Sequence, residues 1–333
     1  MEKELVIIGM AGADETKNEE KKSLNDDTLI KDAFINKNLA LERDGLNSVQ
    51  WIINQYISSG LVKEKNFYVA GSNNHFNGIN LNGANFFDVN VDLVTNALRT
   101  LDHVLQEKED EIKSKNKELW IGFQAMDTLL LEEEHVVKYL NDVFNLTNNN
   151  EKLDMIIQSV SKEAAEKNNL FKFKPDRAFL QFDEKLKKRI KHQAIYGGLL
   201  MMARPSTEDR ELLKTLGNSM YYNRHDNKQI LKTAYNVASY LIRNRYSAFS
   251  DLFMGLNLIK KDKMRKLSFD YLSKVASQIV YQEQGKVKVF CVTQPDVALG
   301  YAGDFDRVSD VIASVSQLKK IRLNENYLKE NYQ

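Results

Sequence analysis

The sequence predicts a mainly α-helical protein of two lobes, an acidic N-terminal lobe and a basic C-terminal lobe, with a few short strands and an N-terminal arm. Apolar residues recur at helical spacing over much of the chain, and a length of 333 residues suits two domains of ordinary size. Residues 1–170 carry a net charge of −11 and residues 171–333 one of +12, which the total of +1 conceals. We therefore predict a strand and charged arm at residues 1–40, an acidic helical lobe at 41–170 and a basic helical lobe at 171–333.

The N-terminal region begins with a short apolar run that predicts a strand over residues 2–10. The charged segment that follows lacks apolar periodicity and is expected to be a linker or arm. The run Leu5 to Ile8 either docks on a neighbouring subunit or forms an edge strand of its own domain.

The acidic lobe is expected to be mostly helical. Helical spacing predicts a helix over residues 46–62, and Asn-Gly and Gly-Ser pairs predict loop, hairpin or short strand over residues 65–90. Helical periodicity returns at about Val91 and continues to Lys167. Pro175, near the change in charge sign, marks the boundary between the lobes.

The basic lobe is expected to hold further amphipathic helices. They are predicted over residues 178–194, from Ser206 as an N-cap, and over residues 227–246, 267–281 and 306–321. One strand is predicted over residues 286–292 before Pro295.

Composition also predicts where in the cell the protein is located. No apolar run is long enough to span a membrane, so we expect a soluble chain without a membrane partner. A single cysteine, Cys291, excludes an internal disulfide framework and suits a reducing compartment. We therefore expect a cytoplasmic location, or a virion if the protein is viral.

Catalytic motifs are sparse in the sequence. Gly9 and Gly12 lack the pattern of a phosphate-binding loop and are interpreted as turn glycines. The single Glu132-x-x-His135 pair is interpreted as part of a solvated acidic helix face, and no histidines have metal-ligand spacing. We expect no catalytic residues, no metal and no cofactor, and therefore a protein that is not an enzyme.

Basic residues cluster in the second half of the chain, with tyrosines among them on the helix of residues 227–246. Lysine and arginine neutralise phosphates, and tyrosine rings stack on bases. Ordinary solvated helix surface is the alternative interpretation for each cluster. The candidate RNA-binding residues are Lys187, Lys188, Arg189, Lys191, Lys228, Lys232, Tyr235, Arg243, Arg245, Tyr246, Lys260, Lys261 and Arg265.

These observations favour a self-assembling, sequence-independent single-stranded RNA-binding protein of nucleoprotein or coat-protein type, similar in general style to viral nucleoproteins. Its expected partners are single-stranded RNA and further copies of itself. The N-terminal arm is one candidate for the segment that joins the copies. A second hypothesis is a metal-dependent nuclease or nucleotidyl enzyme that uses carboxylates such as Asp296, Asp304 and Asp306. A third is a scaffold without nucleic acid, assembled by pairing of acidic and basic lobes.

Overall fold

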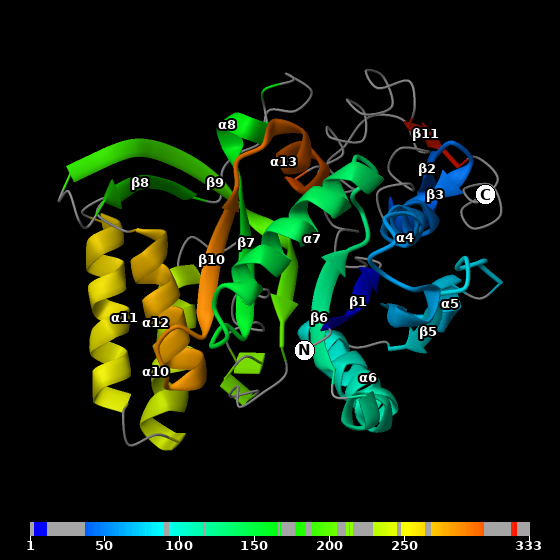
Figure 1. Cartoon of the computed structure of the whole chain (residues 1–333). Helices are drawn as coiled ribbons and strands as arrows, with labels where there is room; N and C mark the ends of the chain where they lie inside the picture. The colour runs from blue at the N-terminus through cyan, green and yellow to red at the C-terminus, as the bar shows by residue number, and fades with distance from the viewer. Residues whose placement is uncertain are drawn as a thin grey trace, which may run out of the picture.

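The computed structural model of the chain describes residues 3–11, 37–76, 78–89, 93–115, 117–165, 167, 177–183, 188–204, 211–212, 214–215, 229–244, 248–263, 268–302 and 321–324. Within these residues the fold is an open α/β sheet with helices on both faces, and a small second sheet lies beside it (Figure 1).

The main sheet has the strand order β10-β7-β9-β6-β1-β4-β5, and β8 pairs with β9 outside this path. Strand β1 is central and lies parallel to both β4 and β6, while β9 runs antiparallel between β6 and β7. Strands β5 and β10 pair in parallel with β4 and β7, so all seven strands of the path except β9 point the same way. The main-sheet strands are β1 (Lys3–Ala11), β4 (Phe67–Gly71), β5 (Asn85–Asp88), β6 (Glu118–Ala125), β7 (Met155–Ser161), β8 (Arg177–Asp183), β9 (Lys188–Ala203) and β10 (Val287–Val292).

Both faces of β1 are buried, which explains its nearly continuous apolar sequence. Leu5 and Ile7 point into one core, and Val6 and Ile8 into another on the opposite face. The first core is covered by α4 (Ser48–Ser58), α7 (Glu133–Asn148) and α13 (Pro295–Ala302). The second is covered by α6 (Leu93–Lys115), and α12 (Phe269–Tyr281) covers β7 and β10 on the same side.

The small sheet has the order β11-β2-β3 and uses strands from both ends of the chain, β2 (Leu41–Arg43), β3 (Leu46–Asn47) and β11 (Ile321–Leu323). The turn between β2 and β3 is formed by Asp44 and Gly45, which both have positive φ, as a two-residue hairpin turn requires. Asn47 then caps α4, because its side-chain oxygen accepts from the Gln50 N–H at 2.9 Å. This tight connection fixes α4 directly against the small sheet.

Short helices and a helical hairpin complete the described part of the chain. The hairpin consists of α10 (Gln229–Asn244) and α11 (Ala248–Lys263) and lies beside α12 (Figure 1). The short helices are α3 (Lys37–Ala40), the 3-10 turn η2 (Glu64–Asn66), α5 (Asn73–Phe76) and α8 (Lys162–Ala165).

Charged groups are bound together at the amino ends of β6, β7 and β10. Asp154 is buried and accepts from the Arg204 Nε at 2.6 Å and pairs with the Lys286 Nζ at 2.8 Å. The Arg204 Nη1 also donates to Glu118 Oε1 at 2.6 Å. Although burial lowers the pKa of Arg204, its bonds to Asp154 and Glu118 outweigh this and raise it, so the guanidinium stays charged in this network.

The predicted fold class is wrong. The chain is an α/β protein with a mostly parallel sheet, where the sequence suggested two helical lobes. The apolar residues of β6 and β7 were assigned to helix, and β8 and β9 occupy the place of the helix predicted at 178–194. Strands buried on both faces lack the alternation by which a strand is recognised in a sequence.

Other predicted elements are confirmed, namely the strand at residues 2–10, the helices at 46–62, 227–246 and 267–281, and the strand at 286–292. Strand β1 has a partner on each side within this chain, so it is neither an edge strand nor an exchange arm. The helix predicted at residues 306–321 lies almost entirely outside the described residues, as does the charged segment at 12–36. The placement of the domain boundary near residue 170 stays a prediction.

Candidate functional site at the carboxyl edge of the sheet

The sheet has a topological switch point between β1 and β6. From β1 the chain proceeds to β4 and β5 on one side, and later crosses to β6 on the other side of β1. At a switch point, the connections that leave the carboxyl ends of the two neighbouring strands run in opposite directions and leave a crevice between them. Open α/β sheets bind their ligands in this crevice. The edge at the ends of β1, β4 and β6 is therefore the first place to look for a site.

Asp127 lies at this edge, two residues beyond the end of β6, and its side chain is partly exposed. Pairing with β1 continues just past the strand, because the Met126 N–H donates to the Met10 carbonyl at 3.3 Å. Asp127 thus lies next to the switch point in the fold.

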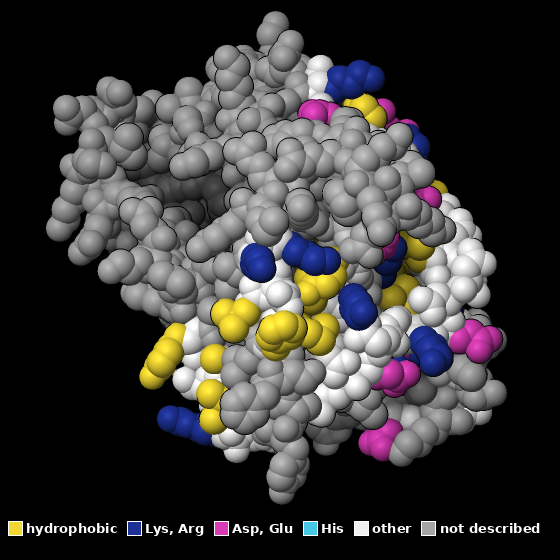
Figure 2. Space-filling view, turned by 90° about the vertical axis from the view of Figure 1, so that its left-hand side faces the viewer, with side chains coloured by type: hydrophobic (Ala, Val, Ile, Leu, Met, Phe, Trp, Pro, Cys, Tyr) yellow, Lys and Arg dark blue, Asp and Glu magenta, His cyan; other side chains and the backbone are white. Residues whose placement is uncertain are grey.

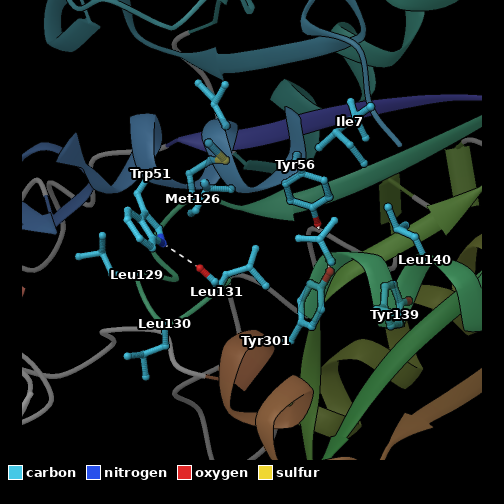
Figure 3. Packing of buried hydrophobic residues seen from close by; sticks show 14 of the residues in the cluster. Ile7, Trp51, Tyr56, Met126, Leu129, Leu130, Leu131, Tyr139, Leu140 and Tyr301 are labelled. Carbon is cyan, nitrogen blue, oxygen red and sulfur yellow. Dashed lines mark hydrogen bonds between the residues drawn. The ribbon is translucent and has the colours of Figure 1, made fainter. Parts of the chain in front are cut away.

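The loop that carries Asp127 is bound by side chains from other elements along residues 125–131. The Ser48 hydroxyl donates to the Met126 carbonyl at 2.7 Å, and the Gln124 amide at the end of β6 donates to the Thr128 hydroxyl at 3.5 Å. The Trp51 indole N–H donates to the Leu131 carbonyl at 2.7 Å (Figure 3). Since buried side chains supply these bonds, the loop has little freedom to move.

Arg43 anchors the same loop from the small sheet. Its guanidinium is buried, donates to the Leu129 carbonyl at 2.9 Å and forms an ion pair with Glu132. It also lies 4.2 Å from the centre of the Trp51 ring, a cation–π contact. Arg43, which lies in β2, thus contacts both α4 and the loop.

A second set of contacts connects the loop to buried tyrosines of α4 and α13. Figure 3 shows Tyr56 and Tyr301 pointing toward each other, with their hydroxyl oxygens 3.5 Å apart. The Tyr56 hydroxyl donates to Gln124 Oε1 at 2.7 Å, which orients the amide that binds the loop. Burial raises the pKa of both tyrosines, so they stay neutral and serve as hydrogen-bonding groups.

Gly9 allows the loop to lie close against β1. A Cβ at this position would be 2.5 Å from the Met126 Sδ and 3.0 Å from the Phe67 ring. The interpretation of Gly9 as a turn glycine is wrong, because the residue lies inside β1 and is needed for close approach.

We expect Gly9→Ala to lower the free energy of unfolding by about 1–3 kcal/mol, since buried Met126 must move to admit the methyl group. Urea denaturation measures the change. Gly255→Ala is the matched control, because Gly255 lies in α11 with nothing within 4 Å of its would-be Cβ. That variant should be slightly stabilised, and equal stability of the two variants would contradict the close approach at Gly9.

The Glu132-x-x-His135 pair has a structural role where α7 begins. The His135 Nδ1 accepts from the Glu132 N–H at 3.2 Å. Burial lowers the pKa of His135, which keeps that nitrogen able to accept. Of the hypothetical enzyme carboxylates, Asp296 is exposed in the first turn of α13, and Asp304 and Asp306 lie outside the described residues. Among the described residues, no group of three or more His, Cys, Asp or Glu side chains could hold a metal ion.

The candidate RNA-binding residues are not brought together at this edge. Lys188, Arg189 and Lys191 are in β9, a strand where a helix was predicted. Lys232, Tyr235 and Arg243 are in α10, and Lys260 and Lys261 are in α11. Lys187, Lys228, Arg245, Tyr246 and Arg265 lie outside the described residues. Lys261 packs on the Tyr271 ring, with its Nζ 3.6 Å from the ring centre; the ligand contacts of the set stay a prediction.

The sequence did not single out Asp127. The pattern that could have found it is an apolar strand followed at once by an acidic residue, as in LWIGFQAMD. This pattern is informative only once residues 118–125 are recognised as a strand.

Comparisons with known proteins give the fold. No family model matches the chain, and no curated protein matches it in sequence. Among solved structures, a hypothetical transferase structure from Thermus thermophilus matches with a TM-score of 0.51 and 18% identity, covering 93% of this chain and 100% of that one.

Weaker matches are a CMP:2-keto-3-deoxy-manno-octonic acid synthetase complexed with CTP and a 4-diphosphocytidyl-2C-methyl-D-erythritol synthase from Anaerococcus prevotii. The synthetase has a TM-score of 0.46 and 9% identity and covers 95% of this chain and 99% of its own. The synthase has a TM-score of 0.38, 9% identity and the same two coverages.

These findings overturn the functional prediction drawn from the sequence. The sequence had suggested a two-lobed helical chain. From it we inferred an RNA-binding nucleoprotein or viral coat protein that is not an enzyme and has single-stranded RNA as its partner. The chain instead has an α/β fold, which it shares with a structure described as a hypothetical transferase. Those predictions are wrong, and self-assembly has no observation in its support.

Proposed function

We propose that the chain is a nucleotidyltransferase. It would transfer the nucleoside monophosphate part of a nucleoside triphosphate to an acceptor oxygen and release pyrophosphate. The observation that carries this proposal is the switch point between β1 and β6 with Asp127 beside it on an anchored loop. The similar Thermus thermophilus structure is described as a hypothetical transferase, which supports the same class.

The chemistry of the edge suits phosphoryl chemistry better than covalent catalysis. Phosphoryl transfer requires chiefly that the reactants be positioned and that their charge be neutralised, so a site need not contain a protein nucleophile. A carboxylate on an anchored loop suits this need, because Mg²⁺ is commonly held by one or two carboxylates together with substrate phosphates and water. This supports the nucleotidyl branch of the enzyme hypothesis, with Asp127 in place of Asp296, Asp304 and Asp306.

The residues of this chain have two tasks in the reaction. Asp127 would hold Mg²⁺, which when bound neutralises charge on the triphosphate. The Asp127 loop is kept in place by bonds from Arg43, Ser48, Trp51 and Gln124. An acceptor oxygen then attacks the α-phosphorus, the bond from that phosphorus to the bridging oxygen breaks, and pyrophosphate leaves.

The proposal is tested by nucleotide binding. We expect ATP, CTP, GTP or UTP with Mg²⁺ to raise the midpoint temperature of thermal unfolding, because a ligand that binds only the folded state stabilises it. The rise should disappear when EDTA replaces Mg²⁺. If none of the four nucleotides with Mg²⁺ shifts the midpoint and none yields pyrophosphate in the presence of phosphorylated or carboxylated acceptors, the proposal is wrong.

A further inference from the structure

The α10–α11 hairpin carries a cluster of exposed apolar side chains that the proposed reaction does not use. Tyr235 and Ile242 on α10 are 73% and 63% exposed, and Phe253 and Leu256 on α11 are 66% and 65% exposed. Within the described residues, these four are the large hydrophobic side chains with high exposure. Exposed apolar groups gathered in one place indicate a contact surface.

We call these four side chains, which come from two neighbouring helices, the hairpin patch. Helices α10 and α11 are joined by three residues and pack on each other, so they run antiparallel. Tyr235 and Ile242 are seven residues apart, or about 10 Å at 1.5 Å per residue. Phe253 and Leu256 lie one turn apart on the neighbouring helix. The patch is therefore about as wide as two packed helices.

Cations stand at both ends of the hairpin patch. Arg243 follows Ile242 near the connection between the helices, and Lys260, one turn after Leu256, lies toward the opposite end. Both side chains are exposed. Among the described side chains of the two helices the one carboxylate, Asp251, is buried. Figure 2, which faces the α10–α11 side of the molecule, shows hydrophobic and Lys or Arg side chains next to each other.

We propose that the hairpin patch docks on the surface of a membrane that contains anionic lipids. Apolar side chains can enter the boundary between headgroups and acyl chains while flanking cations contact anionic headgroups. A second copy of the hairpin would fit less well, because Arg243 and Lys260 would be brought near the same cations of the partner copy. A membrane as binding partner differs from the expectation drawn from the sequence, which was of no membrane partner. The proposed binding is to the membrane surface. No described helix is long and apolar enough to cross a bilayer.

The experiment is co-sedimentation of the full chain with vesicles. We expect binding to vesicles of equal parts phosphatidylcholine and phosphatidylglycerol, no binding to phosphatidylcholine alone, and weaker binding as salt is added. The double variant Phe253→Gln, Leu256→Gln should bind at least about tenfold more weakly, since glutamine keeps helix propensity and removes the apolar surface. The double variant Arg243→Gln, Lys260→Gln should lose about fivefold per cation.

The control removes two exposed cations elsewhere, as Lys65→Gln with Lys152→Gln, and should bind as the parent does. Circular dichroism checks that each variant is folded. Failure of the parent chain to bind anionic vesicles would overturn the proposal. So would self-association in solution that the apolar double variant abolishes, since the patch would then be an interface between copies. Neither result bears on the nucleotidyltransferase proposal, which nucleotide binding tests separately.

Discussion

Replacing Asp127 with asparagine should reduce nucleotidyl transfer by about 10³-fold while the protein stays folded. The amide has nearly the same shape as the carboxylate but lacks the charge that would hold Mg²⁺ beside the triphosphate. The side chain is only partly buried, so its replacement should change the free energy of unfolding little. Pyrophosphate release measures the rate, and thermal unfolding measures stability with and without nucleotide and Mg²⁺.

Asp296→Asn is the control for this experiment. Asp296 is also an exposed aspartate at the carboxyl side of the sheet, but it follows β10, which β9 and β7 separate from β6. It should retain the parent rate. If Asp127→Asn transfers nucleotide as fast as the parent, or if Asp296→Asn is the inactive variant, the site has been placed wrongly.

The second large effect is expected from Arg43→Ala. This change leaves the Leu129 carbonyl without its donor, Glu132 without its ion pair and the Trp51 ring without its cation. A buried carbonyl left without its donor costs about 1–3 kcal/mol, whereas Glu132 is 39% exposed and can be solvated by water, so its lost ion pair adds little. In addition, the Asp127 loop would lose an anchor, and a shift of about 1 Å in a reacting group can reduce the rate about a hundredfold. Urea denaturation gives the first quantity, and pyrophosphate release well below the unfolding temperature gives the second.

Arg204→Ala separates the two effects. Arg204 binds a buried carboxylate, Asp154, at the amino ends of the strands, the edge opposite Asp127. Arg204→Ala should destabilise the protein by about 3 kcal/mol, at least as much as Arg43→Ala, and leave the rate of the folded protein unchanged. If both arginine variants lose the same share of activity, Arg43 acts through global stability and does not position the loop.

Part of this fold could be predicted from the sequence. The elements found correctly have a clear local pattern, such as Val49, Ile52, Ile53 and Tyr56 on one face of α4. Strand β6 was assigned to helix because Trp120, Phe123 and Met126 happen to be spaced at threes. All but two residues of β6 are apolar or glycine, as is usual for a strand with helices on both faces.

The candidate site could not be predicted for a related reason. It depends on which strand ends are neighbours, and pairing between β1 and β6 joins residues more than a hundred positions apart. The charge difference between the two halves is a real property of the sequence, yet it drew attention to lysines and arginines away from this edge. One aspartate such as Asp127 contributes almost nothing to composition.

The small sheet also bears on how the protein is made. Ile321 of β11 pairs with Arg43 of β2, so the strand that carries the anchoring arginine is completed by residues near the other end of the chain. During synthesis the main-sheet strands emerge well before residues 321–323, and domains fold as their parts become available. The Asp127 loop should therefore reach its final support only after residues 321–323 have been made, and a nascent chain that has assembled the main sheet without them should still be inactive.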